Sequence, residues 1–199
     1  MKLNLMKFLN QFLIVGCVVA VLAGCKSAHS KFYTLDATAK GDGASQANYG
    51  VAVGPVSIPA EVDRPQFVVQ VTQTSVSIDE FNRWAGPLKD DISRVVAADL
   101  AKLLGTPRVT SVPLANFVPD YRVSIDIQKF VTAPKMVRVD ALWVVCKAQG
   151  GAKLSGHTVA DESAADDSFD ALVAAHSRAL ERISTDIAAA IRTEAEATP

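Results

Sequence analysis

Alternating apolar and polar residues along several stretches of this chain predict β-strands, because successive side chains of a strand point to opposite faces. Gln66–Thr72 places Phe67, Val69 and Val71 on one face. The expected strands are Phe32–Leu35, Tyr49–Ile58, Gln66–Thr72, Ser75–Ile78, Arg108–Val112, Tyr121–Val131, Val137–Cys146 and Lys153–Ala160. Gly150–Gly151 is a hairpin signal between the last two of these strands.

Two longer stretches carry apolar residues three and four positions apart and predict amphipathic helices. The first follows Pro87, has Asp90 and Asp91 near its start, and ends at Gly105. The second runs from about Ser168 to Glu194. His176 lies on its apolar stripe, so we expect a core-facing histidine with a hydrogen-bond partner.

The order of these elements is strands, helix, strands, helix. It predicts an α+β fold with a mainly antiparallel sheet and two long helices packed on one face. We expect residues 32–194 to form one domain, followed by a polar tail at 195–199.

The N-terminus has the pattern of a bacterial lipoprotein signal. Lys2 and Lys7 precede an apolar run that is too short to span a bilayer, and the run ends in Leu22-Ala23-Gly24-Cys25. We therefore expect residues 1–24 to be a cleaved signal peptide, with cleavage between Gly24 and Cys25, and residues 25–31 to be a tether. Cys25 would carry diacylglyceryl and N-acyl chains, because several acyl chains give a stable membrane anchor.

Composition excludes some classes of function. The formal net charge is −1, and loss of Lys2 and Lys7 with the signal makes it about −3, so nucleic-acid binding is not expected. After removal of the signal and acylation of Cys25, Cys146 alone remains free, so no disulfide framework is expected. No metal-ligand spacing or glycine-rich phosphate loop occurs, and we expect neither a metal or other cofactor nor an enzymatic activity. Ser155 and His157 share a strand face but lack an acidic partner nearby in the sequence.

Several segments in this order resemble the ABC-type transport auxiliary lipoproteins, which include the lipoprotein subunit of the paraquat-inducible Pqi system. The segments are the Cys25 box, Tyr33–Leu35, Val53–Pro59, Asp63–Gln66 and Asn82–Leu88. The resemblance covers essentially the whole chain after the signal. Its most specific parts are the Trp-Ala-x-Pro-Leu segment at Trp84–Leu88 and the Tyr-x-Leu strand after the lipidated cysteine.

This resemblance implies a non-enzymatic accessory subunit of an MCE-type transporter in a Gram-negative envelope. Such a protein would be anchored at the periplasmic face of the outer membrane and would dock the end of the periplasmic lipid tunnel, supporting lipid transport and membrane integrity. Lys26, which follows Cys25, is not the aspartate that typically retains lipoproteins at the inner membrane. The family also implies a homo-oligomeric ring.

Two questions stay open at the level of sequence. The chain could instead be a chaperone lipoprotein that binds lipid or an outer-membrane protein in its own cavity. Trp84 and Leu88 are candidate partner-binding residues, because aromatic anchors dominate interfaces, but Trp84 could equally pack the helix onto the sheet.

Overall fold

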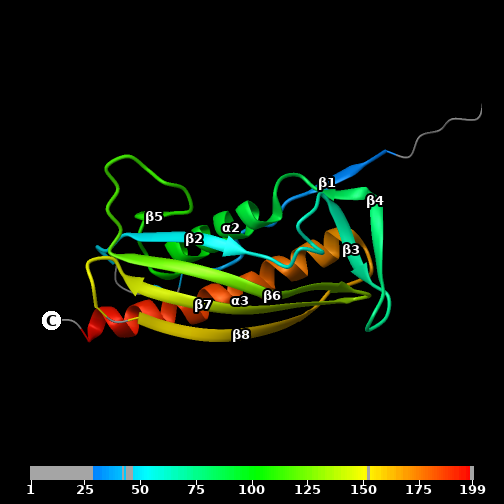
Figure 1. Cartoon of the computed structure of the whole chain (residues 1–199). Coiled ribbons are helices and arrows are strands. Elements are labelled where there is room, and N and C mark those ends of the chain that lie inside the picture. Colours follow the sequence, from blue (N-terminus) through cyan, green and yellow to red (C-terminus); the bar gives the residue numbers. More distant parts are fainter. Residues whose placement is uncertain (1–28, 42, 44–46, 152, 198–199) are drawn as a thin grey trace, which may run out of the picture.

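The structure is a computed structural model that describes residues 29–41, 43, 47–151 and 153–197. The expected signal peptide and the acylation site at Cys25 lie outside these residues. The described part of the chain forms a single sheet of eight strands and two helices (Figure 1). The strands are β1 (Lys31–Tyr33), β2 (Val51–Ser57), β3 (Gln66–Gln70), β4 (Val76–Trp84), β5 (Val109–Thr110), β6 (Tyr121–Ala133), β7 (Met136–Lys147) and β8 (Lys153–Ser163). The helices are α2 (Leu88–Leu103) and α3 (Phe169–Glu196).

The sheet is mixed, so the prediction of a mainly antiparallel sheet was wrong. The long strands β6, β7 and β8 form an antiparallel meander. On the other side of β6 the sheet forks: β2 pairs with its first half in parallel, and β3 pairs with it near Thr132. β5 joins β2, and β1 joins β4, both in parallel. Alternation could not reveal this, because it is the same in parallel and antiparallel strands that have one buried face.

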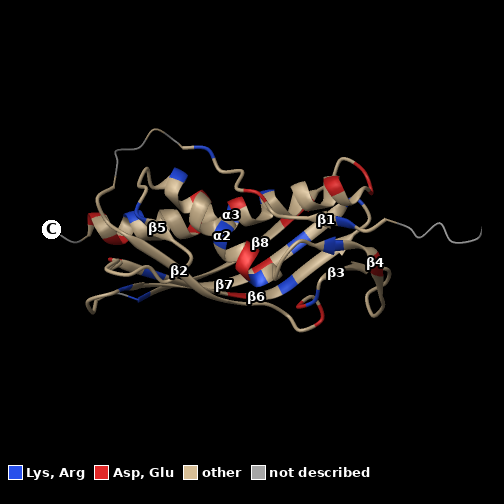
Figure 2. Cartoon of the chain, turned by 90° about the horizontal axis from the view of Figure 1, so that it is seen from above, with Lys and Arg blue, Asp and Glu red and all other residues tan. Residues whose placement is uncertain are grey.

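The fork gives the molecule two distinct ends. β2 and β5 lie beside the start of β6, whereas β3 lies beside its last residues and connects β4 and β1 to the sheet there (Figures 1 and 2). At about 3.4 Å per residue, the thirteen residues of β6 separate these ends by about 40 Å. We call them the β5 end and the β1–β4 end.

Local signals mark the start of α3 and the end of α2. Ser168 caps α3, its Oγ accepting a hydrogen bond from the Ala171 amide at 3.2 Å. α2 ends in a Schellman motif, in which Gly105 has a φ of 63° and the Thr106 amide donates to the Ala101 carbonyl at 3.1 Å. Both helices pack on the same face of the sheet, α2 against β2 and α3 against β7 and β8. The α+β class with two helices on one face is therefore confirmed.

The core lies between this sheet face and the two helices. Trp143 is buried, and its indole Nε1 donates to Thr158 Oγ1 at 3.0 Å. Phe67 stacks on Trp84 with ring centroids 4.1 Å apart, which fastens β3 to the end of β4. Within the described residues, no helix has both the length and the apolar character that crossing a bilayer requires.

Candidate interaction surfaces

Trp84 and Leu88 lie inside the core. Trp84 is 6% exposed and Leu88 2% exposed, so neither side chain is available to a partner on the surface of the isolated chain. Trp84 contacts Phe67 and Phe130, because it is the inward-facing last residue of β4. The sequence left open whether Trp84 binds a partner or packs the helix onto the sheet. In the structure, Trp84 packs between the sheet and the helices.

His176 is a second buried aromatic and is a core residue, as expected. It stacks on Phe130 with centroids 4.1 Å apart, and its Nε2 lies 2.9 Å from Thr132 Oγ1. Complete burial lowers its pKa to about 3, so the ring is neutral at physiological pH. Nδ1 is buried without a hydrogen-bond partner, and an orphaned lone pair costs less than an orphaned N–H. We therefore assign the proton to Nε2, which donates to Thr132.

On the exposed sheet face, the carboxylate of Asp140 lies beside the Ser155 and His157 pair. His157 Nε2 lies 2.7 Å from Asp140 Oδ1 across β7 and β8. All three residues lie on the face opposite the helices, and none of them lines either of the two pockets described below. In the described part of the chain, no three histidine, cysteine or carboxylate side chains gather as a metal site would require. The absence of an enzymatic activity stays a prediction.

A segment after β1, residues 34–41, lies across the two helices and is held by their polar side chains. We call it the N-terminal strap. Asp91 accepts the Leu35 amide at 2.7 Å, and Asp99 accepts the Ala39 amide at 2.9 Å. From α3, Ser177 accepts the Asp36 amide at 3.1 Å. β1 lies between the expected tether and the strap, so these contacts would connect an anchor at Cys25 to the helical layer.

Asp99 is fully buried in this connection. Burial raises the pKa of its carboxyl to about 6, against the opposing effect of the hydrogen bond from Ala39. The charge of Lys102 acts to lower this pKa, and the charge of Glu181 acts to raise it. Sequence reasoning missed Asp99, although a carboxylate within an apolar helical stripe was a signal.

Exposed apolar side chains gather mainly at the two ends of the molecule. Eleven large hydrophobic residues are exposed among the described ones. Five lie at the β1–β4 end (Phe32, Val71, Val76, Ile78 and Phe81), three in the loop after β5 (Val112, Leu114 and Val118), and three on the open sheet face (Met136, Leu142 and Val159). The loop after β5, residues 111–119, contains no charged residue.

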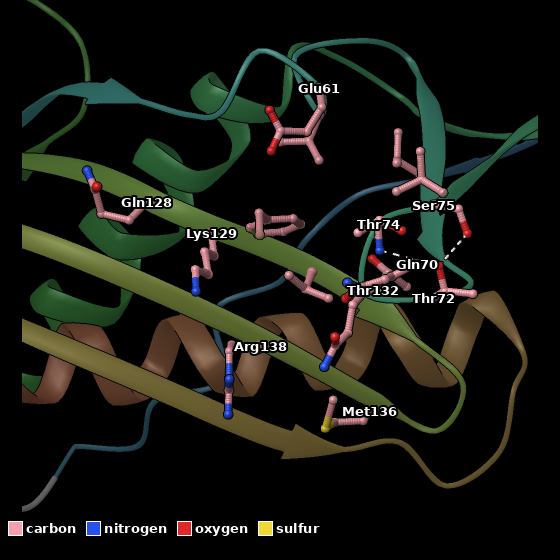
Figure 3. A pocket seen from close by; sticks show the side chains of 16 residues that line it. Glu61, Gln70, Thr72, Thr74, Ser75, Gln128, Lys129, Thr132, Met136 and Arg138 are labelled. Atoms are coloured by element: carbon pink, nitrogen blue, oxygen red, sulfur yellow. Dashed lines mark hydrogen bonds between the residues drawn. The ribbon is translucent and has the colours of Figure 1, made fainter.

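A groove lies at the fork of the sheet, where neither β2 nor β3 covers the middle of β6 (Figure 3). Its volume is about 720 Å³, within the range of small-molecule sites. Its lining mixes apolar side chains such as Val68 and Met136 with the cations Lys129 and Arg138. Arg138 pairs with Asp161 at 2.6 Å, whereas no ion pair forms at Lys129 among the described residues. A smaller hollow of about 440 Å³ lies between β2 and the loop after β5.

The family described as the ABC-type transport auxiliary lipoprotein component matches residues 33–188. The chain belongs to this family. The match begins at Tyr33 in β1 and ends within α3, so the auxiliary lipoprotein fold comprises the sheet, the strap and both helices. This confirms the resemblance inferred from the sequence.

Solved structures share the fold of this auxiliary lipoprotein. A crystal structure of an uncharacterized protein matches with a TM-score of 0.69 and 20% identity, covering 82% of this chain and 99% of that one. Protein XCC0632 from Xanthomonas campestris, assigned to family DUF330, matches with a TM-score of 0.71 and 16% identity, covering 85% and 100%. At these identities the likeness concerns the fold alone. No curated protein matches the chain.

Proposed function

We propose that this auxiliary lipoprotein is acylated at Cys25, sits at the periplasmic face of the outer membrane, and docks the tunnel of an MCE-type transporter. Its membership of the family supports a lipoprotein that assists a transporter. The outer membrane and the MCE subunit are the parts of the proposal that go further, together with the homo-oligomeric ring that the resemblance implies. They rest on the Cys25 box, on Lys26 and on the Pqi resemblance.

The observation that carries the docking role is the separation of the two ends. β1, which follows the expected tether in the sequence, lies at one end, and the uncharged apolar loop 111–119 projects from the other (Figure 1). Non-polar cores of protein interfaces are depleted in charge, as this loop is. An anchored subunit that points such a loop away from its membrane is suited to meet a partner in the periplasm. Anchoring raises the local concentration of the docking surface, so modest contacts suffice.

The test is affinity purification of the acylated protein from gently solubilised envelopes. We expect an MCE-domain subunit to accompany the wild-type protein and to be lost when Val112, Leu114 and Val118 are all replaced by serine. The matched control replaces Leu142 and Val159, which are similarly exposed on the open sheet face, and should retain the partner. If the wild-type protein brings no MCE subunit, the proposal fails. Cys25→Ser should yield a folded but mislocalised protein.

The groove at the fork favours a second candidate function, a lipid-binding chaperone. Its mixture of apolar side chains with the available ammonium of Lys129 is what an anionic amphiphile requires. The discriminating assay is extraction of labelled phospholipid from vesicles. Extraction that Lys129→Gln weakens, in a protein with no affinity for an MCE subunit, would favour the chaperone.

A further inference from the structure

The β1–β4 end presents apolar side chains that the fold itself does not use. Phe32 is 65% exposed and Phe81 49% exposed, although both lie in strands of the sheet. Phe32 pairs with Arg83 in the β1–β4 register, two positions from Phe81 along β4. Isolated exposed apolar residues are common, but a group on adjacent strands marks an interaction surface.

A bulge in β4 produces the exposure of Phe81. The β3–β4 register passes from Gln66–Arg83 directly to Phe67–Asp79, so residues 80–82 have no partner in β3. Asp79 stabilises this bulge, because its Oδ1 accepts the amides of Phe81 and Asn82, both at 2.8 Å. Burial acts to raise the pKa of Asp79, but these hydrogen bonds outweigh it and hold the pKa below its ordinary value.

Glu80, the acidic residue next to Phe81, is already paired. Arg83 forms an ion pair with Glu80 at 3.3 Å, and Gln66 also donates to Glu80. Glu80 therefore does not present an isolated negative charge beside Phe81. Such an arrangement lowers the cost of placing this end against a lipid surface, where an unpaired carboxylate would be unfavourable.

The length of the tether limits which surface can reach the membrane. Cys25 and Lys31 are six residues apart, so even a fully extended chain spans only about 22 Å between them. The β5 end lies about 40 Å further along the sheet. Lying flat would bring it near the membrane, but the broad faces carry charged side chains (Figure 2). On the open sheet face, Arg122, Asp126 and Lys129 are exposed.

We propose that Phe32, Phe81, Ile78 and the β3–β4 hairpin residues Val71 and Val76 form a membrane-contact surface that seats the β1–β4 end in the lipid interface. Phenylalanine and aliphatic side chains partition into this boundary region. This inference rests on the proposed acylation of Cys25. It fixes the direction of the molecule, with the loop 111–119 directed away from the membrane.

The test uses the full acylated protein in phospholipid vesicles, carrying one spin label in a Cys146→Ala background. Cys146 is a free, half-buried thiol on the open face, so its removal leaves the introduced cysteine as the reactive site. Labels replace Phe81 or Ile78 at the proposed surface, and Leu114 or Val118 in the loop as matched controls. Collision rates with oxygen and with a water-soluble nickel complex report whether each label lies in lipid or in water.

We expect labels at 78 and 81 to gain oxygen collisions and lose nickel collisions several-fold when vesicles are present, with labels at 114 and 118 unchanged. A protein that floats with vesicles while its label at 81 stays in water overturns the contact surface and leaves the anchor intact. A protein that does not float refutes the anchor, and the inference with it. Dipolar broadening between labels at 81 that are shielded from both oxygen and nickel would show that a second copy covers this end, and it also overturns the proposal. Each labelled variant must unfold at the wild-type temperature.

Discussion

The buried carboxylate of Asp99 makes the stability of the strap dependent on pH. Its pKa is about 6 in the folded chain against 3.8 in an exposed aspartate. The unfolded chain therefore loses this proton at a lower pH than the folded chain. Stability from this group is fully present below about pH 4 and is lost as pH rises through 6.

The magnitude follows from the difference of about two pKa units. At about 1.4 kcal/mol per unit, ionising Asp99 in the folded chain costs about 2–3 kcal/mol. In the wild-type chain the Ala39 amide donates to Asp99 Oδ1 at 2.9 Å. Asp99→Asn keeps an oxygen that can accept this hydrogen bond, but asparagine cannot ionise. We expect the variant to be as stable as wild type near pH 4 and about 2 kcal/mol more stable at pH 7.5.

The assay is urea unfolding of both proteins across this pH range. The difference between their free energies of unfolding isolates Asp99, because the other titrating groups cancel. Asp91→Asn is the matched control, since Asp91 also accepts a strap amide, from Leu35, but pairs with Arg94 at the edge of α2. It should be less stable than wild type at pH 7.5. If Asp99→Asn is no more stable than wild type there, the argument is refuted.

Three further variants test the packing. Gly156→Ala would place its Cβ 2.1 Å from Trp143 Cζ2, so Trp143 must move. We expect the free energy of unfolding to fall by several kcal/mol and the tryptophan emission to shift to the red. Adding Trp143→Leu should restore part of the lost stability. Thr132→Val leaves the His176 N–H buried without an acceptor, which should cost about 1–3 kcal/mol in urea unfolding, whereas Thr132→Ser should retain most of the stability. Leu88→Ala should cost about 2–5 kcal/mol and Leu114→Ala less than about 0.5 kcal/mol, because Leu88 is buried in the core and Leu114 is exposed; equal thermal shifts would contradict this assignment.

Local signals in the sequence were enough to place the helices. Pro87 and Gly105 bracket α2, and Ser168 caps α3, because each acts on backbone within a few residues. The family could also be recognised, since the segments Tyr33–Leu35 and Trp84–Leu88 remain contiguous in the chain. Acylation of Cys25 and cleavage after Gly24 remain predictions from the sequence.

Features that depend on distant pairs could not be read in the same way. β2 pairs with β6 in parallel, some seventy residues later, and alternation carries no information about which strand lies alongside. Trp84 could have been a partner anchor or a core residue until the β1–β4 register and Phe67 fixed its environment. The groove at the fork arises because β3 contacts β6 only near Thr132, which no local pattern records.

The strap joins the two proposals into one mechanical arrangement. Any force on an acyl anchor enters the fold through β1, whose three residues pair with β4, and then through the strap. The strap is held by Asp91, Arg94, Asp99 and Lys102 of α2 and by Ser177 and Glu181 of α3. These contacts distribute the load over both helices. An anchor attached in this way can hold the β1–β4 end against lipid without straining the opposite loop, whose position depends on β5 and β2 instead.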